Sequence, residues 1–171
     1  MDLGILIIRG VVGLALAAHG SQKLFGWFDG PGLRGTSGVM DRLGFRPARL
    51  WAPLAALSEF GGGLLLAFGL LSPLGSIGIA AAMLVAGLGV HLSKGFWATK
   101  GGYEYNLVLL AGAVALAFTG PGRYSADAVL GIALPDWVGV AGAIALVIGV
   151  AAAFASRRTA PAPSTAKGQR A

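Results

Sequence analysis

Residues 3–25 read LGILIIRGVVGLALAAHGSQKLF, and they form the first of five apolar stretches that decide the fold of the chain. The other four cover residues 50–71, 73–92, 103–118 and 137–155. A helix needs about 20 apolar residues to cross a bilayer, within a range of roughly 17–25. Only residues 103–118 fall just short of this range. We therefore predict an all-α integral membrane protein, a four-helix transmembrane bundle with a fifth transmembrane helix.

The composition excludes an ordinary soluble domain. Of the 171 residues, 56% are hydrophobic and 12% are charged, whereas soluble domains carry about 25% charged residues. The net charge of +6 does not indicate nucleic-acid binding, because the basic residues lie between apolar stretches and at the C-terminus, as at membrane surfaces. The chain has no cysteine, which excludes disulfides and thiol catalysis. Without an HExxH-type motif we expect no metal site.

The distribution of Lys and Arg predicts the orientation. We divide the chain into a bundle at residues 1–130, an additional transmembrane helix at 131–156 and a disordered, basic, cytoplasmic tail at 157–171. With five spans, one side receives nearly all basic residues outside the apolar stretches, which places that side in the cytoplasm and the N-terminus outside. These residues are Arg34, Arg42, Arg46, Arg49, Lys94, Lys100, Arg157, Arg158, Lys167 and Arg170, against Arg123 on the other side.

Two connections are longer than turns. Residues 27–49 are predicted to contain a short interfacial helix that stops near Gly44, and residues 123–134 to lie at the surface. Ser72 and Asp136 are expected to cap the helices that follow them. Small residues at a spacing of four predict close packing of two further helices in lipid. They are Gly78, Ala82 and Ala86 in one stretch and Ala145, Gly149 and Ala153 in another.

Four ionisable side chains fall in the same half of the predicted bundle: His19, Glu59, His91 and Glu104. At a rise of ~1.5 Å per residue, His19 lies ~9 Å and Glu59 ~13 Å inside the basic side. Charges inside lipid are costly, so these residues are functional candidates by default. We expect His19, Glu59 and Glu104 to face one another as candidate catalytic groups. Alternatively, Glu104 snorkels to the interface and His91 is an interfacial residue.

The remaining charged residues of the apolar stretches have structural alternatives too. Glu59 must pair with a cation or carry a proton. Lys23 shares a helix face with His19, or else snorkels. Arg9 is an ion-pair partner or reaches outward. Gly61 to Gly63 lack the partner residues of a phosphate loop and predict close helix packing beside Glu59.

Three of these residues are candidates for contacting a cofactor: His19, Lys23 and His91. A haem with two histidine ligands would use both histidines of the chain, and no motif supports it. We expect no covalently bound cofactor, and a diffusible quinone is the candidate electron carrier.

Several separated motifs occur in order along residues 3–130: Arg9, His19-Gly20, Lys23 to Gly26, Glu59 to Gly62, Tyr103 to Leu107, Gly120 to Ser125 and Asp127. Together they resemble the DoxX family of bacterial membrane proteins. The resemblance implies a four-helix membrane bundle associated with redox partners. Some members are similar to the small subunit of a thiosulfate:quinone oxidoreductase, and others are linked to a membrane complex that handles oxidative and thiol stress. The fifth apolar stretch and the basic tail depart from this outline.

Three functional hypotheses follow. The first is a DoxX-type subunit of a redox-associated complex in the bacterial inner membrane, with a quinone near His19 and Glu59 and an oxidoreductase subunit as partner. The second is a small-molecule or proton-coupled carrier. The third is a non-catalytic anchor, in which residues 27–49 and the tail dock a cytoplasmic protein. A homo-oligomer is the alternative assembly, and every hypothesis includes contact with the lipid bilayer.

The orientation is tested by fusing reporters to residue 171. A fluorescent protein that matures only in the cytoplasm should fluoresce there, whereas a phosphatase active only outside the cytoplasm should be inactive, because the basic side is retained inside. Phosphatase activity without fluorescence would contradict the five-span topology.

Overall fold

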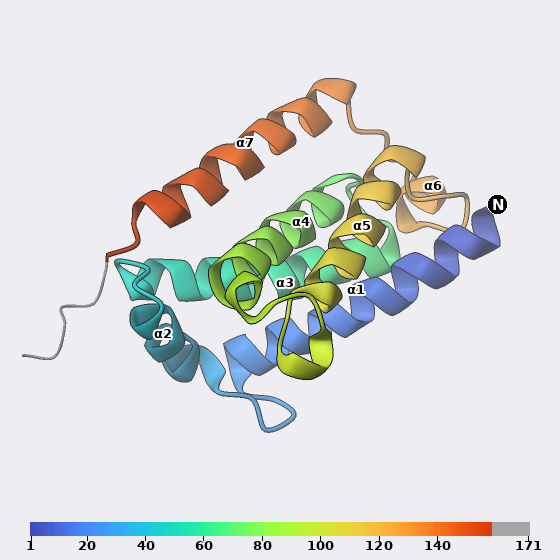
Figure 1. Cartoon of the computed structure of the whole chain (residues 1–171). Helices are drawn as coiled ribbons and strands as arrows, with labels where there is room; N and C mark the ends of the chain where they lie inside the picture. Colours follow the sequence, from blue (N-terminus) through green and yellow to red (C-terminus); the bar gives the residue numbers. More distant parts are fainter. Residues whose placement is uncertain (159–171) are drawn as a thin grey trace, which may run out of the picture.

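The computed structural model describes residues 1–158, which form an all-helical bundle (Figure 1). Residues 159–171, most of the predicted tail, lie outside the described residues. The α-helices are α1 (Asp2–Phe25), α2 (Gly32–Arg42), α3 (Ala48–Phe68), α4 (Leu74–Ala86), α5 (Glu104–Thr119), α6 (Ala126–Leu130) and α7 (Asp136–Ala155). A π-helical turn (Gly87–His91) and a 3-10 turn (Leu92–Lys94) prolong α4.

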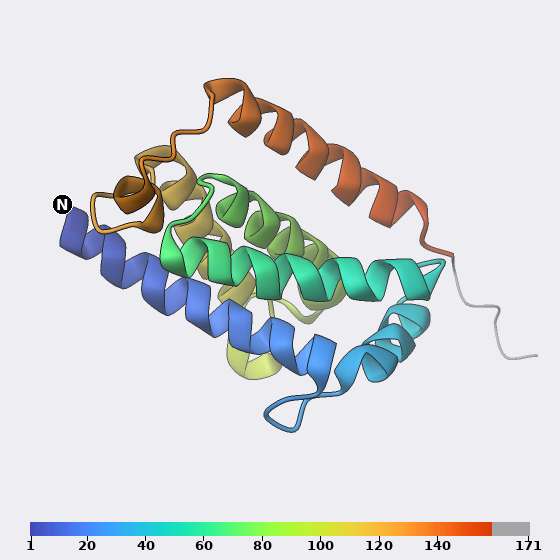
Figure 2. The same cartoon turned by 180° about the vertical axis from the view of Figure 1, so that it is seen from behind.

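The predicted integral membrane bundle is confirmed. Within residues 1–158, four helices are long and apolar enough to span a membrane, and α5, with 16 residues, is shorter. The N-terminus, the α3–α4 turn and α6 lie at one end, while α2, the loop after α4 and the last turn of α7 lie at the other (Figures 1 and 2). We call the latter the basic end. This alternation fits five spans, and the side that faces the cytoplasm stays a prediction.

The predicted interfacial helix is present as α2, and Gly44 follows it with a φ of +86°. Both predicted caps are wrong. The backbone N–H of Ser72 donates to Asp127, and Ser72 makes no cap at the start of α4. Asp136 is already the first residue of α7, where the positive end of the helix dipole stabilises its negative charge.

The closest helix contact joins α1 to α3 through glycines. A Cβ on Gly63 would lie 2.5 Å from the backbone nitrogen of Ala17, and one on Gly13 would lie 2.5 Å from that of Ala67. Gly20 lies equally close to the backbone of Phe60. Only residues without a side chain permit this approach, which gains van der Waals contact in lipid. The packing expected for the glycine run thus holds for Gly63.

The hydrophobic core lies between α1, α3, α4 and α5. These helices contribute close-packed, almost fully buried hydrophobic side chains, and this packing fixes the rotation of each helix relative to the others. The core residues are Leu16, Leu66, Ile79, Ala82, Met83, Leu109, Ala113 and Leu116.

Helix α7 lies apart from this core and follows α4 along one flank (Figure 1). Gly142 meets the side chain of Ile77, but a Cβ on Gly149 would meet no atom within 4 Å. Of the predicted stripe on α7, Ala145 and Gly149 are exposed, whereas Ala153 is 2% exposed and packs against the bundle. The predicted packing of α7 therefore holds only at its last turn. At the basic end, the Phe154 ring lies 5.9 Å from that of Phe45. The backbone N–H of Arg158 donates to Gly44 at 2.9 Å, so the first tail residues are held against the end of α2.

Replacing Gly63 with alanine should destabilise the protein by about 1–3 kcal/mol, because the added methyl group overlaps the α1 backbone. Gly61→Ala is the matched control, since a Cβ there meets nothing within 4 Å. Thermal unfolding in detergent should show a lower midpoint for Gly63→Ala only. Equal midpoints for the two variants would mean that the glycine contact does not hold the helices together.

Candidate functional site

A cavity of about 370 Å³ lies between α2, α3, α4 and α7, in the half of the bundle nearest the basic end. Its lining is mostly aliphatic. Three ionisable side chains join it from different elements: Lys23 from the last turn of α1, Glu59 from the middle of α3 and His91 from the end of the π-helical turn. An apolar cavity with few polar groups is the usual form of a small-molecule site.

Lys23 and Glu59 form an ion pair at the cavity wall. The Lys23 Nζ donates to Glu59 Oε1, and Glu59 is only 3% exposed. The Lys23 side chain is 31% exposed and reaches inward, so it does not snorkel away from the bundle. The cation offsets part of the cost of burying the carboxylate. Among the described residues, Glu59 Oε2 is buried and has no hydrogen-bond partner.

The glycine contact between α1 and α3 positions this pair. Gly20 packs against the backbone of Phe60, the residue that follows Glu59. Lys23 lies three residues after Gly20 and therefore on the same face of α1. The approach of the two backbones brings the Lys23 side chain within reach of the carboxylate. The formation of the ion pair thus depends on helix packing as well as on the attraction between the two charges.

His91 has a fixed ring orientation. Its Nδ1 lies 2.7 Å from the carbonyl oxygen of Gly101. A carbonyl only accepts hydrogen bonds, so Nδ1 carries the proton and Nε2 of the neutral ring is an acceptor. The residue ends a π-helical turn, a local structure that is frequent at functional sites.

The structure does not assemble the expected cluster of His19, Glu59 and Glu104. His19 is exposed on α1, with its ring centroid 6.2 Å from that of Tyr105. Glu104 Oε2 accepts the backbone N–H of Ala98 at 2.9 Å and organises the loop before α5. Within residues 1–158, no three His, Asp or Glu side chains form a group that could hold a metal ion.

The expected cluster does not form because the three side chains leave their helices in different directions. Counting residues gives depth along the axis, and the three residues are indeed near the same end. His19, however, is one residue before Gly20, about 100° around the helix from the face that meets α3. His91 lines the cavity, whereas His19 lies outside its lining and next to Tyr105. Tyr105, missed at the sequence level, lies within electrostatic range of Glu59.

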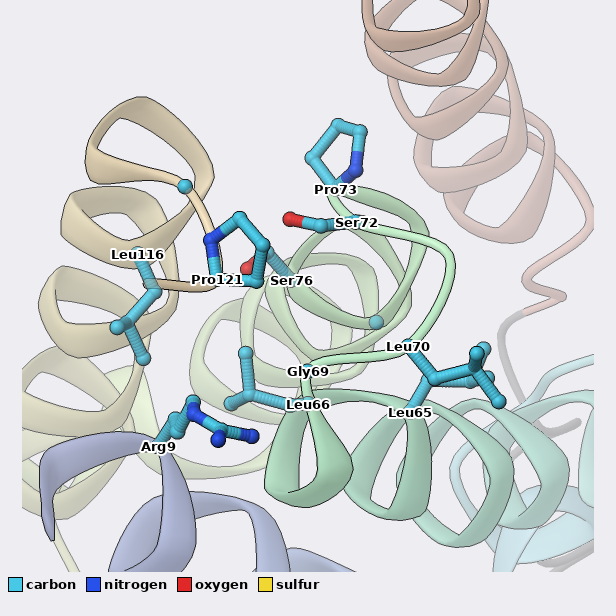
Figure 3. Close-up of a pocket in the computed structure, with 12 residues that line it drawn as sticks. Arg9, Leu65, Leu66, Gly69, Leu70, Ser72, Pro73, Ser76, Leu116 and Pro121 are labelled. Atoms are coloured by element: carbon cyan, nitrogen blue, oxygen red, sulfur yellow. The ribbon is translucent and has the colours of Figure 1, made fainter. Parts of the chain in front are cut away.

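A second polar centre lies at the opposite end, around Arg9 (Figure 3). Arg9 is 2% exposed, and one guanidinium nitrogen donates to the carbonyl of Ala67 at 2.6 Å while the other donates to that of Tyr124. The partners are carbonyls, one of them at the negative end of the α3 dipole, and neither an acidic residue nor outward snorkelling is involved. The adjoining void is only about 10 Å³.

The turn that receives Arg9 is held by Asp127. Its two carboxylate oxygens accept the backbone N–H groups of Leu71 and Ser72 at 2.8 and 2.9 Å. A Cβ on Gly69 would lie 2.7 Å from Arg9 Nη1, so glycine is required there. Both terminal guanidinium nitrogens of Arg9 are held by backbone carbonyls, whereas its Nε is buried without a hydrogen-bond partner among the described residues. Because the adjoining void is too small for a ligand, we assign this centre a structural role.

The DoxX family model matches residues 4–92, slightly more than half of the 171-residue chain. The chain belongs to the DoxX family. The matched region of this DoxX protein includes Lys23, Glu59 and His91, and α7 lies outside it. The chain is also similar to inner membrane protein YqjF of Escherichia coli (strain K12), with 31% identity over 129 residues, which cover 75% of this chain and 93% of that protein. No solved structure matches.

Replacing Lys23 with methionine should destabilise this DoxX protein by about 2–3 kcal/mol, because it leaves the buried Glu59 carboxylate uncompensated. Unfolding in detergent, followed by circular dichroism, measures the loss. The double variant Lys23→Met/Glu59→Leu should recover most of it, since no buried charge is left.

Lys94→Met is the control for loss of a positive charge, because Lys94 is exposed at the basic end. A double variant no more stable than Lys23→Met would show that the pair is not the source of the effect.

Proposed function

We propose that this DoxX protein is a membrane subunit of a redox-associated complex in the bacterial inner membrane, with Glu59 as a proton-handling group. Family membership and the similarity to an inner membrane protein, YqjF, support the family context and the membrane. The observation that carries the proposal is a buried carboxylate, held on one oxygen only, at the wall of an apolar cavity.

The Lys23–Glu59 pair supports proton handling by its position. The carboxylate is buried, whereas the lysine side chain that binds it is 31% exposed. The pair therefore connects the cavity wall to the basic end, where water and a partner protein can reach it. A proton transferred to or from Oε2 would change the charge of the pair without breaking the contact at Oε1.

The electron carrier must come from outside the chain. Without cysteine, the chain has no thiol, disulfide or cysteine-ligated cluster. We infer that a partner oxidoreductase or a diffusible quinone supplies it. The exposed basic residues around α2 and the loop after α4 offer a surface for an acidic partner.

The cavity also supports a second candidate function, a small-molecule carrier with Glu59 as the coupling site. Purified protein in liposomes distinguishes the two, because a carrier accumulates solute without a partner subunit. The anchor hypothesis gains less support, since an anchor needs no buried ion pair.

Replacing Glu59 with glutamine keeps the shape and removes the proton-transfer group. In the complex purified from native membrane, quinone-linked turnover should fall at least about tenfold, because general acid–base catalysis typically contributes that much or more. His19→Gln is the matched control, since His19 lies near the same depth but outside the cavity. Its turnover should stay within about twofold of wild type.

Full activity of Glu59→Gln in the assembled complex would remove the proton-handling role and leave Glu59 as a pairing residue. Quinone reduction by the purified wild-type chain alone would overturn the subunit assignment.

A further inference from the structure

We propose that the cavity between α2, α3, α4 and α7 binds a neutral, lipid-soluble molecule whose head group carries a hydroxyl, donated to Glu59 Oε2. The biological role of this site rests on the proposed function, but binding itself is a property of the chain alone. The proposal depends on how the cavity is kept open, where it opens and which head group its polar atoms accept.

Two contacts hold α7 against the bundle, one with Ile77 of α4 and one with Phe45, which precedes α3. Toward the N-terminal end, the side chain of Ile77 fills the space under Gly142. At the basic end, the ring of Phe154 rests on that of Phe45, which is itself 1% exposed. Small residues of α4 and α7 line the cavity, and a Cβ on Gly149 would meet no atom within 4 Å. The free volume is therefore built into the packing.

The cavity opens sideways, toward the lipid. Leu54 of α3 lines it and is 45% exposed, and Ala145 and Gly149 of α7 line it and are exposed as well. Figure 2 shows that α7 approaches α3 toward the basic end and diverges from it toward the other end. Because the surrounding helix faces are apolar and lie within the predicted spans, a lipid-soluble molecule can enter from the bilayer without crossing water.

The size of the cavity fits a small ligand. Its volume of about 370 Å³ lies within the range of roughly 300–1,000 Å³ for small-molecule sites. Aliphatic side chains and the ring of Phe45 would contact an apolar body, and Lys23, Glu59 and His91 supply the few polar contacts.

The polar atoms select the charge of the head group. Glu59 Oε2 is a buried acceptor without a partner among the described residues, so it calls for a donor. A cationic head would bring a second positive charge next to Lys23, whose own charge Glu59 already compensates. An anionic head would face the carboxylate. A neutral hydroxyl donates to Oε2 and leaves the net charge of the site unchanged, which is the least costly choice in a low-dielectric site.

Two sources provide this chemistry: a hydroquinone, and a long-chain aliphatic alcohol. The oxidised quinone has the same ring but carries only carbonyl acceptors, so it cannot satisfy Oε2. His91 Nε2 is a further acceptor in the lining. The site should therefore bind the reduced form of a quinone pair more tightly than the oxidised form.

The test uses the full chain in nanodiscs and measures binding of a short-chain hydroquinone, its quinone and a long-chain alcohol under anaerobic conditions. We expect the hydroquinone to bind at least tenfold more tightly than the quinone. Glu59→Leu should abolish this preference. Gly149→Leu should weaken binding of every ligand at least tenfold by filling the cavity, whereas Val147→Leu, on an exposed part of α7 outside the lining, should leave it unchanged.

Equal affinity for hydroquinone and quinone, or unchanged binding in Gly149→Leu, would overturn the proposal. Gly149→Leu keeps this test informative if Glu59→Leu does not fold, because α7 packs outside the core. Tighter binding of the alcohol than of the hydroquinone would support the hydroxyl site and at the same time count against the redox role. Failure of all three ligands to bind would overturn the site while leaving the subunit function to be judged on the assembled complex.

Discussion

The approach of two backbones at the α1–α3 crossing is the constraint on which the other features depend. Gly13, Gly20 and Gly63 bring the helices together over about two turns of α1. With the crossing fixed, the ends of α1 are fixed as well. Arg9 then reaches the last carbonyls of α3, and Lys23 reaches the carboxylate in its middle. Both polar contacts are made by side chains of α1, and packing aligns α1 with α3 so that these side chains reach their partners.

The two ends of the bundle differ in the free volume beside their buried charged residue. At the N-terminal end, Arg9 is surrounded by carbonyl groups and a tight turn, and the remaining void is about 10 Å³. At the basic end, Glu59 keeps one oxygen unpartnered next to a cavity of about 370 Å³. Each end keeps one buried polar atom without a partner among the described residues, Arg9 Nε at one end and Glu59 Oε2 at the other. The free volume distinguishes them, because a buried polar atom beside a ligand-sized cavity is typical of a site. The candidate ligand site therefore lies in the half of the bundle nearest the basic end.

Hydrophobic patterning predicted the spans, because the bilayer sets the length of each helix and leaves few alternatives. The interfacial helix and the pairing of Glu59 with a cation could also be predicted from the sequence. The cluster of His19, Glu59 and Glu104 could not be judged from depth alone, since rotation about each helix axis depends on packing. The cavity was equally out of reach, because it depends on where the contacts of Ile77 and Phe154 place α7 against the rest of the bundle. Asp127 was recognised as part of a motif, but its role in the α3–α4 turn required the structure.

The shortness of α5 has a consequence for the membrane around the protein. Its 16 residues span about 24 Å at a rise of ~1.5 Å per residue, less than the ~30 Å of a typical hydrocarbon core. Val108 and Phe118 on this helix are 65% and 87% exposed, so lipid chains meet it directly. Where α5 crosses the membrane, this mismatch favours a thinner bilayer along this flank, at a cost that grows with each ångström of mismatch. Acyl chains of shorter length lower that cost, and the protein should therefore gather them around α5.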